Sequence, residues 1–586
     1  MDSTSTDEYR PCYITYDSFP EFKQSWKRSL ADSAPTLRDE FPDYHLSDPE
    51  SLVHTRTQAC TFDIGTGSSI YTQSIIPAIV RAKHEVILVT CFWAKSPTLT
   101  ALKETLERLA EWRRQRIQEI RASNPNANIS SLRIRICFSS RSFFQKLFHT
   151  SSRDGYVYPQ STWSRQLGLP NPEILEAGLI DLRIKSLFFL PFSVMHPKFL
   201  IVDRERAWLP SCNVSWETWL EFCVEITGDA VDGLVEFYRH VWDKKLENIP
   251  QPGSDDASRK LPSPRLGDLQ LTSTLSTVGI FEGLLPDVSI PTVLLPSSHH
   301  RNPKFDIIPW HNSPSPPSTP LNVAILLLLD IAKHFIYIQT PNLTSTAVID
   351  KLLEALERGV NVAIVTSKRL MILEQLVTAG TTTSICVRSL IQRYDRLRTQ
   401  YQQSKGTGNQ ATPDQSIDIE AQRPPLGRLR ISYFRPDPDH EDKKASEEPV
   451  QSHMKFTLVD GQYVVLGSGN MDRASWFTSQ ELGIMFHSGK VAGALASAVG
   501  IALSHRKEHV FSSTAEDDEE SERQPSSQES TTNQDYQHSK KTASYVQGER
   551  SGMSRSRSDF SAFVTSRMTF ERFMSGKPAN PQDGRS

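Results

Sequence analysis

Two stretches of the chain carry the same succession of polar and apolar positions. The segments AKHEVILVTCFW at 82–93 and AKHFIYIQTPN at 332–342 each run from a short polar end into β-branched and aromatic residues, which predicts a strand. Eighteen residues after each histidine comes Leu-x-Glu-x-Leu-Glu-Arg, whose leucines four apart predict an amphipathic helix with one face on a sheet. These helices begin near 102 and 352, and each is followed by another predicted strand, at 132–139 and 361–367.

The repeated order of strand, helix and strand indicates a duplication, because equal spacing in two places is improbable by chance. The predicted fold class is therefore α/β, with two similar lobes, each a mostly buried β-sheet flanked by helices.

Polar and proline-rich stretches divide the rest of the chain. A Pro/Ser-rich segment, including HNSPSPPSTP at 311–320, is expected to link the lobes. The last stretch has too few apolar residues to offset chain entropy and is expected to be disordered. The predicted parts are an N-terminal extension at 1–55, a first lobe at 56–250, a linker at 251–320, a second lobe at 321–511 with a loop at about 400–425, and a tail at 512–586.

Composition narrows the possible functions. A net charge of −3 over 586 residues argues against a protein that holds nucleic acid through a broad basic surface. Seven scattered cysteines form no zinc-type pattern and are expected to be buried free thiols. The polar start of the chain shows no signal peptide, and the apolar run at 323–329 is too short to span a bilayer. We therefore expect an intracellular protein, with membrane contact only at the surface.

A second repeated pattern carries candidate chemistry. Each half contains His-x-Lys-x-x-x-x-Asp and then, at the same seventeen-residue step from the histidine, an asparagine. One such motif arises by chance in about a few per cent of chains of this length, but two in equivalent halves do not. The paired residues are His196, Lys198, Asp203, Ser211 and Asn213 in the first half, and His453, Lys455, Asp460, Ser468 and Asn470 in the second.

The residue types fit a phosphate group. Apolar β-prone residues follow each lysine, so the motifs are expected on strands, where residues two apart share a face. An imidazole beside an ammonium group can attack phosphorus or pass a proton while the lysine offsets charge on the oxygens. The serines and asparagines add neutral hydrogen-bond donors.

No cofactor or metal is expected. Trp208, Trp216 and Trp219 crowd the first motif, and we expect them to pack in the interior.

The paired motifs resemble the HKD signature of the phospholipase D superfamily over roughly residues 60–510. The second half is the closer match, and its Ser475 and Glu481 extend the likeness to cardiolipin synthases and phospholipases D. The resemblance implies one active site at the lobe interface and a two-step phosphoryl transfer. In that scheme His196 forms a phosphohistidine, and His453 protonates the leaving alcohol.

The resemblance also implies roles for the other candidates. Both lysines and both asparagines would hold the phosphate. Glu481 and Glu225, with Glu221 as the alternative to the latter, resemble acids that orient the histidines through the second ring nitrogen. Asp203 and Asp460 belong to the catalytic motifs, but we expect them to stabilise their halves.

One departure and two alternatives remain open. The first half has Pro210 where the family has glycine, which removes a backbone N–H and constrains the turn. The favoured function is a glycerophospholipid phosphodiesterase or transphosphatidylase, cardiolipin synthase-like, acting at a membrane surface. The first alternative is a nuclease, because the same chemistry serves any phosphodiester. The second is a pseudoenzyme that binds phospholipid without turnover.

Overall fold

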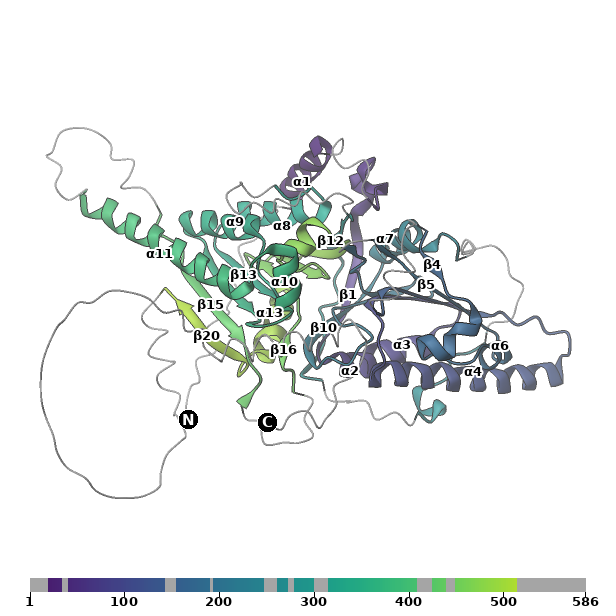
Figure 1. The fold of residues 1–586 in the computed structure, drawn as a ribbon. Coiled ribbons are helices and arrows are strands. Elements are labelled where there is room, and N and C mark those ends of the chain that lie inside the picture. The colour runs from purple at the N-terminus through teal and green to yellow at the C-terminus, as the bar shows by residue number, and fades with distance from the viewer. Residues whose placement is uncertain are drawn as a thin grey trace, which may run out of the picture.

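The computed structural model describes nine segments of the chain: 19–33, 41–142, 154–189, 193–246, 261–271, 279–299, 315–407, 424–438 and 448–513. They form a mixed α/β fold around a large sheet of eighteen strands, with helices packed on it (Figure 1). No helix in these segments is long and apolar enough to cross a membrane.

The strands of the first half form one continuous series. In order of pairing they are β11 (Phe281–Leu284), β1 (Val53–Gly65), β10 (Trp219–Thr227), β9 (Arg206–Pro210), β8 (Phe199–Val202), β2 (Glu85–Phe92), β3 (Leu132–Ser140), β5 (Ile180–Ser186) and β4 (Tyr156–Val157). β2, β3 and β5 run parallel to one another, and β8 is antiparallel to β2. The strands predicted at 82–93 and 132–139 are thus neighbours in one sheet.

The second half repeats this order. Its strands are β12 (Ile290–Ser297), β19 (Glu481–His487), β18 (Tyr463–Gly467), β17 (Phe456–Val459), β13 (Phe335–Thr340), β14 (Asn361–Thr366), β15 (Leu429–Phe434) and β20 (Lys507–Ser512). β13, β14 and β15 are parallel, and β17 is antiparallel to β13, as their counterparts are in the first half. The order and direction of the strands are therefore repeated in the two halves, as the sequence pattern predicts.

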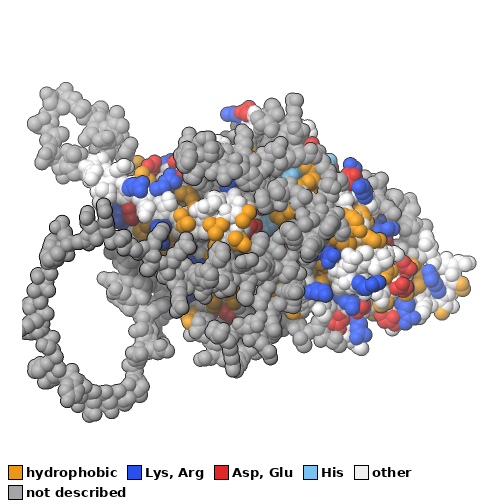
Figure 2. Space-filling view, in the orientation of Figure 1, with side chains coloured by type: hydrophobic (Ala, Val, Ile, Leu, Met, Phe, Trp, Pro, Cys, Tyr) orange, Lys and Arg blue, Asp and Glu red, His pale blue; other side chains and the backbone are white. Residues whose placement is uncertain are grey.

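The helices cover the sheet with apolar faces. In the first half they are α2 (Gly67–Ile70), α3 (Ile76–Arg81), α4 (Pro97–Ser123), α6 (Pro172–Ala177) and α7 (Asp229–Tyr238). In the second they are α8 (Pro320–Ile331), α9 (Thr346–Glu357), α10 (Ile372–Ala379), α11 (Thr383–Thr407), α12 (Arg473–Phe477) and α13 (Gly489–Ala502). The predicted leucine helices are α4 and α9, and their leucines are buried. On the face in Figure 2, blue and red side chains mix over α4 rather than form a basic patch.

Three predicted boundaries need correction. The expected linker contains β11 and β12, and β12 is an interior strand between β1 and β19 because its residues are largely apolar and buried. The expected loop at about 400–425 begins later, since α11 continues to Thr407 and residues 408–423 lie outside the described segments. The predicted tail begins within β20, which ends at Ser512, and residues 514–586 also lie outside them.

The N-terminal extension packs on the second half. Its helix α1 (Phe19–Ser33) buries Phe22 and Trp26, and the Trp26 indole N–H donates to the Pro320 carbonyl at 3.0 Å. Phe19 stacks on His487 of β19. The six cysteines in the described segments are free thiols, and all but Cys60 are buried.

The aspartates of the two motifs close equivalent turns. Asp203 has φ 55° and Asp460 has φ 50°, a left-handed conformation that aspartate tolerates better than most residues. The Asp203 carboxylate accepts three consecutive backbone N–H groups, from Lys83, His84 and Glu85, and the Asp460 carboxylate likewise accepts from Lys333, His334 and Phe335. Each aspartate thereby fixes the start of the neighbouring parallel strand.

Replacing Asp460 with alanine should destabilise the fold. Asp460→Ala leaves three N–H groups without an acceptor. Alanine must also adopt the left-handed conformation without the side-chain hydrogen bonds that stabilise aspartate there. Together these losses should lower the free energy of unfolding by about 2 kcal/mol. Asp460→Asn keeps an acceptor and should lose less. Chemical denaturation would measure both, with Asp350→Ala, an exposed surface pair to Arg393, as the matched control. Equal stability of Asp460→Ala and Asp350→Ala would contradict this role.

Candidate active site

The two histidine motifs lie immediately before equivalent buried strands. His196 and Lys198 precede β8, and His453 and Lys455 precede β17, so the strands begin one residue after the lysines rather than at the histidines. Each lysine turns back on its own motif: the Lys198 ammonium donates to the His196 carbonyl at 2.9 Å and the Lys455 ammonium to the His453 carbonyl at 2.7 Å. The expected side-by-side arrangement of histidine and lysine is thus present, with an extended segment rather than a strand as its basis.

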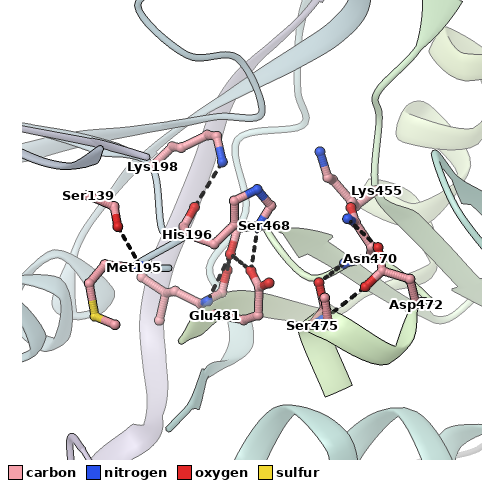
Figure 3. Close-up of polar contacts among 12 residues, drawn as sticks. Ser139, Met195, His196, Lys198, Lys455, Ser468, Asn470, Asp472, Ser475 and Glu481 are labelled. Carbon is pink, nitrogen blue, oxygen red and sulfur yellow. Dashed lines mark hydrogen bonds and ion pairs between the residues drawn. The ribbon is translucent and has the colours of Figure 1, made fainter. Parts of the chain in front are cut away.

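Each histidine contacts a carboxylate from the other half of the chain. The Nδ1 atom of His196 lies 2.8 Å from Oε2 of Glu481, and Nδ1 of His453 lies 2.9 Å from Oε1 of Glu221. Figure 3 shows Glu481 between the imidazole of His196 and the hydroxyl of Ser468. An ionised carboxylate accepts the Nδ1 proton, which leaves the lone pair of each neutral ring on Nε2.

Backbone hydrogen bonds hold these crossed pairs in register. The His196 N–H donates to the Gln480 carbonyl at 2.9 Å, and the His453 N–H donates to the Leu220 carbonyl at 2.9 Å. Strand β16 (Gln451–Ser452) also pairs in parallel with the start of β10. Each histidine is therefore fixed to the residue that precedes its partner glutamate.

The serines of the two motifs bind the same carboxylates. The Ser211 hydroxyl donates to Glu221, and the Ser468 hydroxyl donates to Glu481. Both serines are buried, as are both glutamates. Each glutamate thus joins the serine of its own half to the histidine of the other, so the serines support the carboxylates rather than point at a free phosphate pocket.

Glu221 takes the place that the sequence analysis gave to Glu225. Glu225 pairs with Arg206 and accepts from Thr61, and it contacts neither histidine. Glu225 follows His196 by 29 residues and Glu481 follows His453 by 28, yet these two glutamates are not equivalent in the fold. The second half carries α12 before its glutamate. Sheet register gives the right equivalence, since Cys223 faces Pro210 just as Gly483 faces Gly467.

The asparagines lie in different surroundings. Asn213 Oδ1 accepts the Phe92 N–H at 3.2 Å, and Asn470 Nδ2 donates to Asp472 Oδ2 at 2.9 Å. The Asn470 N–H donates to the Ser475 hydroxyl, and the Asn470 Oδ1 atom is buried without a hydrogen bond. An orphaned buried acceptor beside the site is a group that a bound donor could satisfy.

Pro210 leaves the first loop largely unchanged. Its counterpart Gly467 has φ 149° and lies so close to the Leu482 carbonyl that a side chain would clash. The following serines nevertheless make the same backbone bond, Ser211 N–H to Phe222 O at 2.8 Å and Ser468 N–H to Leu482 O at 3.1 Å. The proline therefore alters the strand end without displacing Ser211.

Burial and neighbouring cations make both imidazoles weak bases. Burial lowers the pKa of His196, and Glu481 partly opposes this. Burial also holds the pKa of His453 well below its usual value, and the Lys455 and Lys198 ammonium groups lower it further. Burial lowers the pKa of Lys455 to about 7 and raises that of Glu221 to about 7. Two lysines in a buried site favour an added anion.

The two histidines are not equivalent. The Nε2 atom of His453 lies 2.8 Å from the Lys455 ammonium nitrogen, and the Trp219 ring lies 4.8 Å from the His453 ring at a tilt of 47°. None of the described residues makes a hydrogen bond to Nε2 of His196. Trp219, for which packing in the interior was favoured over lining a lipid entrance, thus lies against one imidazole. In the sequence, Trp219 stands two residues before Glu221, and the equivalent position before Glu481 is Ser479. This difference between the halves is the signal that could have indicated a special role for Trp219.

Within the described segments, no group of three or more His, Cys, Asp or Glu side chains is arranged to hold a metal ion. The site is instead a buried cluster of two histidines, two lysines and two glutamates with their serine and asparagine neighbours.

Comparison with solved structures finds distant likenesses. A phosphatidylserine synthase from Haemophilus influenzae is 13% identical, with a TM-score of 0.40 over 83% of this chain and 92% of that chain. Nuc, a phospholipase D family member from Salmonella typhimurium, is 17% identical, with a TM-score of 0.20 over 32% of this chain and 90% of that chain. These scores support no conclusion about activity. No curated protein matches the sequence.

The sequence of the second half matches a family model. Residues 325–499 match the family described as cardiolipin synthase, PLD-like domain, and they include the second histidine motif and Glu481. This part of the chain, in the second half, is therefore similar to a cardiolipin synthase, PLD-like domain.

Proposed function

We propose that the protein is a phosphodiesterase or phosphatidyltransferase that acts on glycerophospholipids through a phosphohistidine. The observation that carries this proposal is the pair of crossed contacts, His196 to Glu481 and His453 to Glu221. Two imidazoles with the same tautomer, in one lysine-lined site, provide a nucleophile and an acid for a single phosphodiester.

The proposed organisation is two lobes that share one site. We assign the first lobe to residues 56–250 and the second to residues 321–511, with β12 joining β1 of the first lobe to β19 of the second within the one eighteen-stranded sheet. Glu221 and Glu481 support this assignment because each completes the other lobe's histidine. Neither lobe contains a complete pair alone.

In the first step, His196 is the nucleophile. Because its Nδ1 proton is held by Glu481, the Nε2 lone pair can attack phosphorus. The N–P bond forms as the bond from phosphorus to the headgroup oxygen breaks, and His453 gives that oxygen a proton. In the second step, His453 takes a proton from water or an alcohol, whose oxygen attacks phosphorus and releases His196.

The lysines account for the change in protonation at His453. In the free site the Lys455 ammonium lies against Nε2 of His453 and opposes a second positive charge there. A bound phosphodiester anion offers Lys455 a better partner and favours the imidazolium form. Lys198, Asn213 and Asn470 would complete the phosphate site. Ser211 and Ser468 act as positioning residues through their glutamates.

A lipid substrate is favoured over nucleic acid by two observations. The matched family is described by a lipid enzyme, cardiolipin synthase. The chain is also nearly neutral, and acidic and basic side chains mix over α4 in Figure 2, whereas non-specific nucleic-acid binding depends on phosphate neutralisation.

The first test measures headgroup release from mixed phospholipid vesicles with a primary alcohol present. His196→Asn and His453→Asn should each reduce release and alcohol transfer by about 10³-fold or more, because each removes an obligatory group. The exposed His505→Asn is the matched control. Cleavage of DNA or RNA but not of lipid would establish the nuclease instead. No turnover of either, with phospholipid still bound, would establish a pseudoenzyme.

The pH profile should report the nucleophile. His196 must be neutral to attack, and burial lowers its pKa, so it stays neutral at a more acid pH than an ordinary histidine. The acid limb of kcat/KM should therefore lie below the usual histidine range, near 6.5. A limb at or above that range would contradict this assignment of the nucleophile.

The Lys455 ammonium should lower the His453 pKa measurably in the free protein. Lys455→Met removes a cation 2.8 Å from Nε2, so the His453 pKa should rise. NMR titration of isotope-labelled histidines would measure it, with the exposed Lys490→Met as the matched control. A His453 pKa that falls or stays constant would show that burial alone sets its value.

A further inference from the structure

Helix α10 turns its apolar side outward. Its buried side chain is the polar Gln375, at 3% exposure, whereas Leu376 and Val377 are 41% and 51% exposed. Leu373 lies three and four residues before them, on the same side of the helix. Ile385, near the start of α11, is 55% exposed. A surface helix normally buries its apolar side, so this orientation needs an explanation.

Hydrogen bonds on the polar side fix that orientation. The Gln375 Oε1 atom accepts from the Thr383 N–H at 2.6 Å and from its hydroxyl at 2.9 Å, and Nε2 donates to the Leu370 carbonyl at 2.6 Å. Left-handed residues, Met371 at φ 53° and Gly380 at φ 65°, bracket the helix. Rolling the leucine side inward would leave the buried amide without partners, which is costly.

The helix lies beside the second motif. α10 packs against α12, which follows Asn470 and Asp472. The Gln375 side chain lies 2.9 Å from that of Asn342 on the loop after β13. Figure 2 shows hydrophobic side chains gathered on the surface where Figure 1 draws α10. Helix α10 therefore lies close to the second motif, with Gln375 on the side of the motif and the apolar side chains at the surface.

The charge around this apolar side is positive. From 368 to 388 the chain has three basic residues and one acidic residue. Lys368 pairs with Glu508, but Arg369 and Arg388 are exposed, and no described acid pairs with either. Exposed leucine, valine and isoleucine side chains with exposed arginines close by in the chain match the interface of a bilayer with anionic headgroups, where apolar side chains enter the acyl boundary and cations meet phosphates.

We propose that a surface here, the α10 face, docks the protein on an anionic lipid bilayer with the second motif toward the membrane. Its residues are Arg369, Leu373, Leu376, Val377, Ile385 and Arg388. Docking itself does not require catalysis. The statement that docking brings a lipid substrate to the active site rests on the proposed function. A cluster of apolar side chains held outward beside a phosphate site brings that site to the depth of the lipid headgroups.

Vesicle flotation of the full chain in a His196→Asn background tests the docking. Vesicles of equal parts phosphatidylcholine and phosphatidylglycerol should bind the protein more tightly than phosphatidylcholine alone. Leu376→Ser with Val377→Ser should weaken apparent affinity for the mixed vesicles by about tenfold. Arg369→Gln with Arg388→Gln should weaken it by about tenfold or more, and high salt should remove that difference.

Matched controls separate this effect from general changes in the surface. Ile174→Ser with Leu284→Ser removes exposed apolar groups elsewhere, and Arg108→Gln with Arg121→Gln removes exposed charges from α4. Both pairs should bind vesicles like the parent. Thermal unfolding of all variants should be unchanged. Vesicle binding by the α10 variants that equals the parent's would overturn the proposal, as would conversion of a dimer to a monomer by Leu376→Ser with Val377→Ser.

A short-chain phospholipid below its micellar concentration separates this proposal from the proposed function. With His196 left intact, the α10 variants should release headgroup from this dispersed substrate at the wild-type rate and from vesicles more slowly. If no substrate is turned over but vesicle binding follows the α10 face, the proposed function fails and the docking stands. If dispersed and vesicle substrates are both cleaved at the parent rate, the docking fails alone.

Discussion

The crossed histidine–glutamate pairs are the constraint on which the site depends. A buried carboxylate is costly unless it is hydrogen-bonded, and Glu221 and Glu481 each obtain one partner from their own half and one from the other. The same two contacts set the tautomer of both imidazoles. Assembly of the halves and orientation of both imidazoles are therefore one event.

Symmetry of the pairs does not make the two sides chemically alike. Lys455 and Trp219 lie against the His453 ring, whereas the His196 ring keeps more solvent access, with its side chain 13% exposed against 3%. A reaction with two different proton-transfer roles needs such a difference. Duplication supplies two equivalent frames, and later substitutions around one of them supply the asymmetry.

The sequence alone predicts those features of the structure that depend on short-range patterns of residues. The strands before α4 and α9, the helices themselves and both histidine motifs follow from short-range periodicity and spacing, and Asp203 and Asp460 each accept hydrogen bonds from the start of a neighbouring strand. The sequence does not predict contacts that depend on register between distant segments. Glu221 rather than the favoured Glu225 contacts His453, and that contact depends on sheet register. Strand β12 lies in a Pro/Ser-rich segment, and its pairing partners are far away in the chain.

Strand β1 has a consequence for the order of folding. Its first residues pair with β12, as Val53 with Val293, while its later residues pair with β10. During vectorial synthesis, the early part of this strand leaves the ribosome long before its partner exists, and closing that contact spans a loop of roughly 240 residues. Until β12 is made, the first half has an open sheet edge, and such an edge favours mispairing with other strands. High contact order, rather than weak local structure, is the obstacle this chain meets in the cell.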